Sequence, residues 1–152
     1  MEIIKISDDK EKMSIAESIL MALPEWFGLP DSLSEYVRDC VGKTFFCAFE
    51  KEKPIGFLYL KETGRDTIEL YVMGVLKEYH RKGIGRALFE AARKTAKKDG
   101  YSFIQVKTVQ MGKYESYDNT NRFYLSLGFK EFEVFKTLWD EWNPCQVYVM
   151  AL

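Results

Sequence analysis

The chain has 152 residues, of which 47% are hydrophobic, 15% aromatic and 30% charged, and its formal net charge is −1. This composition excludes a disordered chain, which would be poor in aromatic residues, and a general basic surface for nucleic acid or anionic membrane. The length predicts one domain over residues 1–152, and no apolar run approaches the roughly 20 residues that span a bilayer.

The histidine and cysteine content bears on metal binding and location. A single histidine, His80, excludes a multi-histidine metal site, and Cys40, Cys47 and Cys145 show no close metal-type pairing. We therefore expect no bound metal. The odd cysteine count, without a recognisable secretory leader, favours a reducing, cytoplasmic location. We expect the three thiols to be buried as small hydrophobic groups.

Hydrophobic periodicity predicts an α/β fold of the α+β type, with a mixed sheet of about seven strands flanked by about four helices. The strand–helix–strand run from 66 to 109 implies a parallel pair with a right-handed crossover. Gly100 is placed to end the helix of this run. The predicted elements are strand 2–6, helix 9–22, a helix from 31 or 32 to about 40, strands 43–50, 54–62 and 66–76, helix 84 to about 99, strand 101–109, helix 117–127, and strands 129–138 and 145–151.

Residues 72–88, with the sequence VMGVLKEYHRKGIGRAL, predict a strand, a glycine-containing loop and the start of a helix. The first turn of a helix has unpaired N–H groups, and together with the helix dipole these favour an anion. Gly83 and Gly85 leave room for a ligand beside the main chain. Because Arg81, Lys82 and Arg86 add positive charge, we expect a diphosphate to bind here. The dinucleotide and P-loop motifs fit this loop less well.

Two segments resemble the motifs of a known family. The segment HRKGIG, residues 80–85, resembles motif A of the GCN5-related N-acetyltransferases (GNAT), with His80 where the family has Gln or Arg. The segment NRFYLSLGF, residues 121–129, resembles motif B. The two segments also have the order and the separation that they have in the family. The resemblance implies acetyl-CoA as co-substrate and a splayed parallel strand pair at the cofactor site.

The resemblance also implies roles for individual residues. The backbone of Val75 and Leu76 would pair with the pantetheine arm, and Tyr124 would protonate the departing CoA thiolate. Tyr117 stands where the family often has an asparagine that contacts pantetheine, so it is a further cofactor-binding candidate. The implied pyrophosphate loop consists of His80, Arg81, Lys82, Gly83, Ile84 and Gly85, together with Arg86.

Acetyl transfer to a primary amine requires the neutral amine as nucleophile. With a pKa near 10.4, only about one lysine-like amine in 2500 is uncharged at pH 7. Glu69 is the first candidate for the general base, because it lies on the strand of Val75 and because some family members use a glutamate at this offset. The alternative is that Glu69 only bonds neighbouring backbone. Glu25 is the reserve candidate, and no covalent enzyme intermediate is needed.

The acceptor side of the site is predicted from aromatic residues in loops. In the family fold, the loop between the first two helices lies over the substrate mouth. Here it has the sequence LPEWFGLP, with Trp26, and we expect Trp139 and Trp142 to reach the same region. Their rings would either hold an amine by cation–π contact or pack the loops. The acceptor remains open between a small-molecule amine and a protein N-terminus or lysine, and a homodimer remains open too.

Two other functions compete with N-acetyl transfer. One is a sensor or regulatory module that binds CoA without turnover, and the candidate catalytic residues Tyr124 and Glu69 argue against it. The other is an unrelated nucleotide-binding protein that uses the glycine-containing turn. Tight binding of acetyl-CoA, without binding of ATP or NAD, would exclude the latter.

Overall fold

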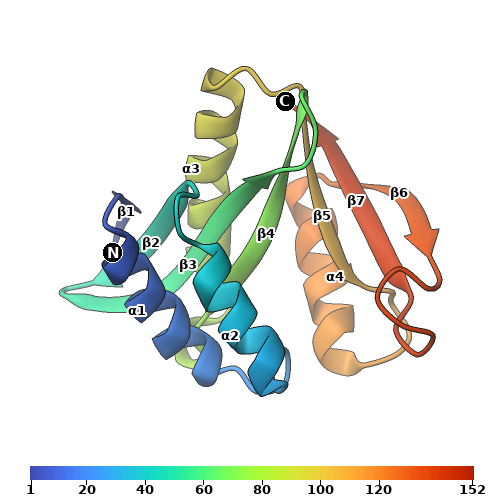
Figure 1. The fold of residues 1–152 in the computed structure, drawn as a ribbon, viewed down its shortest axis with the longest axis horizontal. Coiled ribbons are helices and arrows are strands. Elements are labelled where there is room, and N and C mark those ends of the chain that lie inside the picture. The colour runs from blue at the N-terminus through green and yellow to red at the C-terminus, as the bar shows by residue number, and fades with distance from the viewer.

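Seven strands form one mixed sheet in the computed structural model, which describes residues 1–152. The strand order is β1-β2-β3-β4-β5-β7-β6 (Figure 1). All neighbours are antiparallel except β4 and β5, which are parallel as the sequence predicts. The elements are β1 (Glu2–Ile6), α1 (Asp9–Met21), α2 (Pro30–Asp39), β2 (Phe45–Glu50), β3 (Lys53–Glu62), β4 (Thr67–Val75), the short 3-10 helix η1 (Lys77–Tyr79), α3 (Ile84–Lys98), β5 (Phe103–Val109), α4 (Glu115–Leu127), β6 (Lys130–Phe135) and β7 (Cys145–Ala151).

The two faces of the sheet bury separate hydrophobic clusters. On one face, α1 and α2 cover β1 to β4, with Ile19 and Leu20 packed against strand residues such as Phe57. On the other face, α3 and α4 pack on the central strands through residues that include Leu88 and Tyr124. The face covered by α1 and α2 stays bare over β5, β7 and β6 (Figure 1). None of the helices is long and apolar enough to cross a bilayer.

The predicted fold class and the seven strands and four helices are confirmed, with small shifts at element ends. The second helix begins at Pro30 rather than at residue 31 or 32, because the fixed φ of proline suits the first helical position. The sixth strand ends at Phe135 rather than at 138, where a turn follows whose Asp140 carboxylate accepts the N–H groups of Trp142 and Asn143. The three cysteines are buried and free, as predicted.

The parallel pair β4–β5 holds together over only three residue pairs. These pairs are Thr67–Phe103, Ile68–Ile104 and Glu69–Gln105. Beyond them β4 continues beside β3, while β5 continues beside β7 to its end at Val109. The two strands therefore diverge toward their carboxyl ends, as the family resemblance implies, and the region between these ends is here termed the cleft.

Asn121 fixes α4 across this cleft. Its side chain is fully buried and donates to the carbonyl oxygens of Val109 (2.9 Å) and Tyr117 (2.7 Å). Its Oδ1 accepts the hydroxyl of Tyr148 on β7 at 2.6 Å. Every polar atom of the side chain is thus used to join α4 to β5 and β7. Asn121 lies one helical turn before Tyr124, so this network also sets the position of that residue.

We predict that Tyr148→Phe destabilises the protein, because it leaves Oδ1 of Asn121 buried without a donor. The expected loss is about 1–3 kcal/mol of unfolding free energy, measured by urea denaturation. Tyr101→Phe is the matched control, since its hydroxyl bonds Glu62 at the exposed surface (2.7 Å) and its loss should change stability by about 0.5 kcal/mol or less. Equal losses in the two variants would contradict a stabilising role for the buried network.

Candidate active site

Residues 81–86 form an open anion cradle at the start of α3. None of their six N–H groups finds a hydrogen-bond acceptor within the chain, and the first bond of the helix runs from Ala87 N to Gly83 O. Arg81 and Gly83 have left-handed backbones, with φ of 61° and 79°. Such turns direct neighbouring N–H groups toward one side and make anion-binding concavities. The helix dipole and the side chains of Arg81, Lys82 and Arg86 favour a bound anion further.

Gly83 and Gly85 have different structural roles, although the sequence predicts that both leave room for a ligand beside the main chain. A Cβ at Gly83 would meet no atom within 4 Å, so this residue is required by its positive φ. A Cβ at Gly85 would lie 2.9 Å from Phe123 of α4 and 3.1 Å from Met73 of β4. Gly85 therefore lets α3 approach α4 and β4 closely, which is a packing requirement in addition to any role in ligand binding.

The end of β4 presents groups that are already bonded within the chain. The carbonyl of Val75 is 2.6 Å from Nε2 of His80 and accepts its N–H. The N–H of Leu76 donates to Ile55 on β3, and its carbonyl accepts from Tyr79. A ligand pairing with Val75 would therefore take the place of the His80 imidazole, and Leu76 has no free backbone group. The pantetheine role of these two residues stays a prediction.

Tyr124 projects from α4 into the core beside the cleft and is 7% exposed. Its ring packs against Phe123, Phe129 and Tyr148, with centroids 5.6, 5.9 and 6.4 Å away. Burial, helped by the nearby charge of Glu69, raises the pKa of the hydroxyl well above its usual value near 10. The hydroxyl makes no hydrogen bond within the chain, and it is not among the fully enclosed polar atoms. It is therefore a protonated donor available to a ligand.

Glu69 and Lys107 form an ion pair across the base of the cleft. Glu69 is only 4% exposed, and its Oε1 accepts a hydrogen bond from Nζ of Lys107 at 2.8 Å. Its Oε2 has no donor within the chain and is free to accept one. The sequence predicts Glu69 at this site but not Lys107, whose only signal is a charged side chain in a predicted central strand. The alternative, that Glu69 only bonds neighbouring backbone, differs from the structure, where its partner is the Lys107 side chain.

Trp26 joins the loop between α1 and α2 to both sides of the cleft. Its indole N–H donates to Thr120 Oγ1 (3.2 Å) and to the Ser116 carbonyl (3.3 Å), both on α4. Tyr117 donates its hydroxyl to the carbonyl of Trp26 at 3.2 Å. The indole also meets the imidazole of His80 edge to face, with the ring centroids 6.0 Å apart. The Tyr117 hydroxyl is thus used to hold this loop, while its predicted contact with the cofactor stays a prediction.

A family model described as an acetyltransferase (GNAT) domain matches residues 42–131. The chain belongs to the GNAT acetyltransferase family. The matched segment contains the anion cradle and the three side chains at the cleft, Glu69, Lys107 and Tyr124. The family assignment made from HRKGIG and NRFYLSLGF is therefore confirmed.

Three individual proteins resemble this GNAT chain. An uncharacterized N-acetyltransferase from Chlorobaculum tepidum is 28% identical over 115 residues, which make up 76% of this chain but only 64% of the relative. A GNAT-family protein from Desulfovibrio desulfuricans has 19% identity and a TM-score of 0.83, over 99% of this chain and 98% of its own. An aminoglycoside 6′-N-acetyltransferase complexed with coenzyme A has 18% identity and a TM-score of 0.79, over 99% and 97%. The GNAT fold therefore extends over nearly the whole chain.

Three of the predicted acceptor-side residues are exposed. Glu25, the reserve base, forms an exposed ion pair with Lys77 of η1 at 2.5 Å, and its role as a base stays a prediction. Trp139 and Trp142 are 47% and 71% exposed in the connection between β6 and β7. Neither ring packs against Trp26 or another aromatic side chain. The structure thus brings Trp26 against His80 and α4, while the predicted role of the other two tryptophans stays a prediction.

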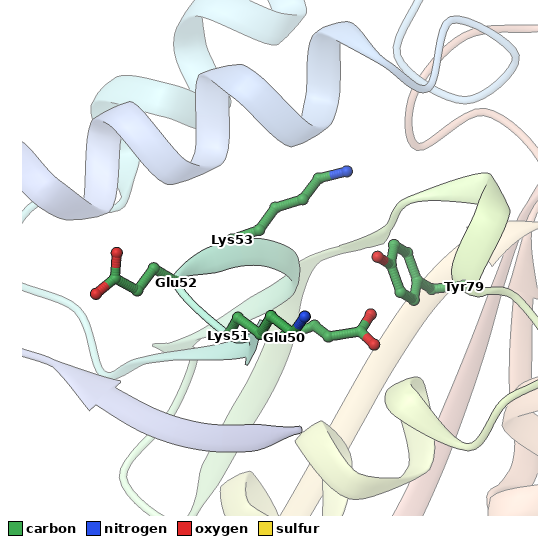
Figure 2. A pocket seen from close by; sticks show the side chains of 5 residues that line it. All are labelled: Glu50, Lys51, Glu52, Lys53 and Tyr79. Carbon is green, nitrogen blue, oxygen red and sulfur yellow. The ribbon is translucent and has the colours of Figure 1, made fainter.

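A separate hollow of about 580 Å³ lies on the outer side of the GNAT cofactor loop. Figure 2 shows its lining, Glu50 to Lys53 from the turn between β2 and β3 and Tyr79 from η1. The Tyr79 ring also has the ammonium of Lys82 5.5 Å from its centroid. Two carboxylates and two ammonium groups balance each other here, and Tyr79 is the one hydrophobic residue among the five that line the hollow. This hollow is therefore a poor place for a reaction that must exclude water.

We predict that Gly83→Ala weakens acetyl-CoA binding at least tenfold, or about 1.4 kcal/mol, when it is measured by calorimetry. A Cβ is strained at φ of 79°, and relief of that strain turns the N–H groups of the cradle away from the anion. Gly100→Ala is the matched control, because Gly100 has φ of 92°, open space around it and a place at the far end of α3. It should cost similar stability and leave binding intact. A folded Gly83→Ala protein that binds acetyl-CoA with normal affinity would show that the anion cradle does not bind this ligand.

Proposed function

We propose that this protein is an acetyl-CoA-dependent N-acetyltransferase that moves the acetyl group to a primary amine by direct attack in a ternary complex. The observation that carries the proposal is the cleft between β4 and β5. One end of the cleft has an anion cradle with six free N–H groups, and its base has the Tyr124 hydroxyl beside the Glu69–Lys107 pair. Three free and buried thiols suit a reducing compartment, and we place the reaction in the cytoplasm.

Acetyl-CoA fits the residues that line this cleft. The N–H groups of residues 81–86 and the charges of Arg81, Lys82 and Arg86 suit its pyrophosphate. The unpaired edge of β4 suits an extended chain that bears amide groups, with Val75 offering its carbonyl once His80 moves aside. The structurally similar aminoglycoside 6′-N-acetyltransferase, which was solved with coenzyme A, supports the same use of the fold.

Glu69 and Lys107 would together select and activate the neutral amine. A protonated amine has no lone pair for attack, and at pH 7 deprotonation is uphill by about 4.6 kcal/mol for a lysine-like amine. The free Oε2 of Glu69 accepts the proton, directly or through one water molecule. The Lys107 ammonium holds Oε1 and repels a second positive charge, so the site favours the neutral form of the acceptor.

Tyr124 would serve as the acid for the leaving thiolate. A thiol with a pKa near 8.5 is a fair leaving group, so proton donation helps without being obligatory. Because burial raises the pKa of the Tyr124 hydroxyl, this group remains protonated throughout the pH range in which amines become reactive. Its ring is held by three aromatic neighbours and by the Asn121 network, so the hydroxyl has a fixed position at the cleft.

A turnover screen tests the proposal. The protein is mixed with acetyl-CoA and a panel of small amines, lysine-containing peptides and peptide N-termini, and thiol release is recorded. We expect release that depends on the amine. Binding of acetyl-CoA without turnover on any amine would instead identify a CoA-binding sensor. Binding of ATP or NAD in place of acetyl-CoA would overturn the proposal altogether.

We predict that Tyr124→Phe lowers kcat by about 10²–10⁴ while acetyl-CoA affinity changes little, because the ring still packs. In the wild-type enzyme the raised pKa of Tyr124 implies that its ionisation causes no loss of rate up to about pH 10. Stopped-flow thiol release at several pH values measures both effects. An unchanged kcat, with the chemical step shown to limit the rate, would exclude Tyr124 as the acid.

We predict that Glu69→Gln lowers kcat/KM at pH 7 by about 10², and that part of the activity returns as the pH rises and the amine deprotonates by itself. Lys107→Gln is the matched control, because it removes the same ion pair and keeps the carboxylate. We expect it to lose stability through the unpaired buried charge but to keep a larger part of the wild-type kcat/KM at pH 7 than Glu69→Gln does, because the proton acceptor is still present. Similar losses in both variants, with the same pH profile, would mean that Glu69 acts only through the ion pair.

A further inference from the structure

We infer that the acceptor is a small primary amine with an unbranched apolar substituent, and that the substituent lies in a groove on the bare face of the sheet. The inference rests on the proposed function and specifies its substrate class. The groove has a volume of about 440 Å³, within the range of small-molecule sites. Its apolar walls are Phe103 of β5, Phe132 of β6, and Val147 and Val149 of β7.

The groove lies next to the candidate catalytic pair, because two residues that line it are in register with Glu69 and Lys107. Gln105, in its floor, lies in register with Glu69, and Val147, in its wall, lies in register with Lys107. Residues in register on neighbouring strands point to the same face of a sheet. The groove and the ion pair therefore share the face that α1 and α2 leave uncovered, and an amine at Glu69 would direct its substituent along the groove.

The lining of the groove determines what that substituent is. No charged side chain lines it, and the one amide, that of Gln105, already donates to Thr63 Oγ1 at 2.8 Å. Phe103 and Phe132 are 44% and 64% exposed, which leaves apolar surface open beside a polar reaction centre. A hydrocarbon chain would cover this surface. A second ammonium group would lose hydration there and gain no partner.

The floor of the groove also argues for a small amine rather than a peptide. A peptide held in extended form needs free backbone groups on a neighbouring strand. In the floor, β5 pairs with β7 from Phe103 to Val109, and β4 pairs with β5 from Thr67 to Glu69. Phe103 and Gln105 are thus paired on both sides and offer no free backbone groups, so recognition there rests on the apolar walls and on the amine at Glu69.

A chain-length series of amines tests this inference. With saturating acetyl-CoA, kcat/KM is measured for propylamine, butylamine, pentylamine and hexylamine. We expect a rise of about two- to fourfold per methylene group, the upper value being that for complete burial. For 1,6-diaminohexane we expect no increase of kcat/KM over propylamine, because its second ammonium group would lie in the apolar groove. A short peptide with an apolar N-terminal residue is included and should react more slowly than hexylamine.

Two variants of phenylalanine residues on β6 test whether the dependence of kcat/KM on chain length arises in the groove. Phe132→Ala removes a wall of the groove and should flatten the dependence on chain length, while the KM for acetyl-CoA and the rate with propylamine stay normal. Phe135→Ala removes an equal side chain from β6 outside the groove and should keep the full dependence. Both sites are partly exposed, so both variants should fold.

The outcomes separate this inference from the proposed function. Acetylation of propylamine without dependence on chain length would overturn the apolar groove and leave N-acetyl transfer standing. Equal rates for hexylamine and 1,6-diaminohexane, or a peptide that reacts faster than every alkylamine, would do the same. If no amine is acetylated although acetyl-CoA binds, the proposed function fails and the inference fails with it.

Discussion

The rest of the site depends on the divergence of β4 and β5 after only three paired residues. Buried backbone groups must find partners, so two strands that part inside a protein leave carbonyl and N–H groups to be satisfied in another way. Here side chains take the place of the missing strand. The His80 imidazole donates to the carbonyl of Val75, and the Asn121 amide donates to that of Val109.

These two capping bonds differ in kind. Asn121 is buried and fully bonded, whereas His80 is held by one bond and an aromatic edge. The β5 side of the cleft is therefore the fixed one, and the β4 side is the one at which a ligand competes with a side chain.

The base of the cleft carries a charge pair that stability alone does not explain. Removing Glu69 from water is unfavourable, and apolar residues of similar size would often be as stable as a buried ion pair. Lys107 reaches Glu69 from the neighbouring strand at the point where the pairing ends, so the pair also bridges the two strands. It leaves one carboxylate oxygen without a partner, and the charge of Glu69 adds to the burial that raises the pKa of Tyr124. In the proposed reaction the pair would therefore act on both the acceptor and the leaving group.

The sequence predicts local features of this molecule well and pairwise contacts poorly, for physical reasons. Periodicity and glycine placement predict the elements, because they reflect backbone preferences over a few residues. The anion cradle is visible for the same reason, since one short segment makes all of it. The contacts of Lys107 and Trp26 escape prediction, because their partners lie 38 and 94 residues away and depend on strand register and on helix placement. Asn121 lies within the recognised motif, but its structural role follows only from the positions of Val109 and Tyr148. Gly85 also belongs to a recognised motif, yet the motif does not reveal that this glycine is needed for the packing of α3 against α4 and β4.

The contacts of Trp26 connect parts of the molecule that the chain sequence keeps separate. The loop between α1 and α2 is held to α4 by the indole N–H and by the Tyr117 hydroxyl, and to η1 by the ion pair of Glu25 with Lys77. The indole edge then meets His80, whose imidazole bonds the Val75 carbonyl. Because Trp26 also anchors this loop to α4, which carries Tyr124, the loop, α4 and the end of β4 are linked by direct side-chain contacts.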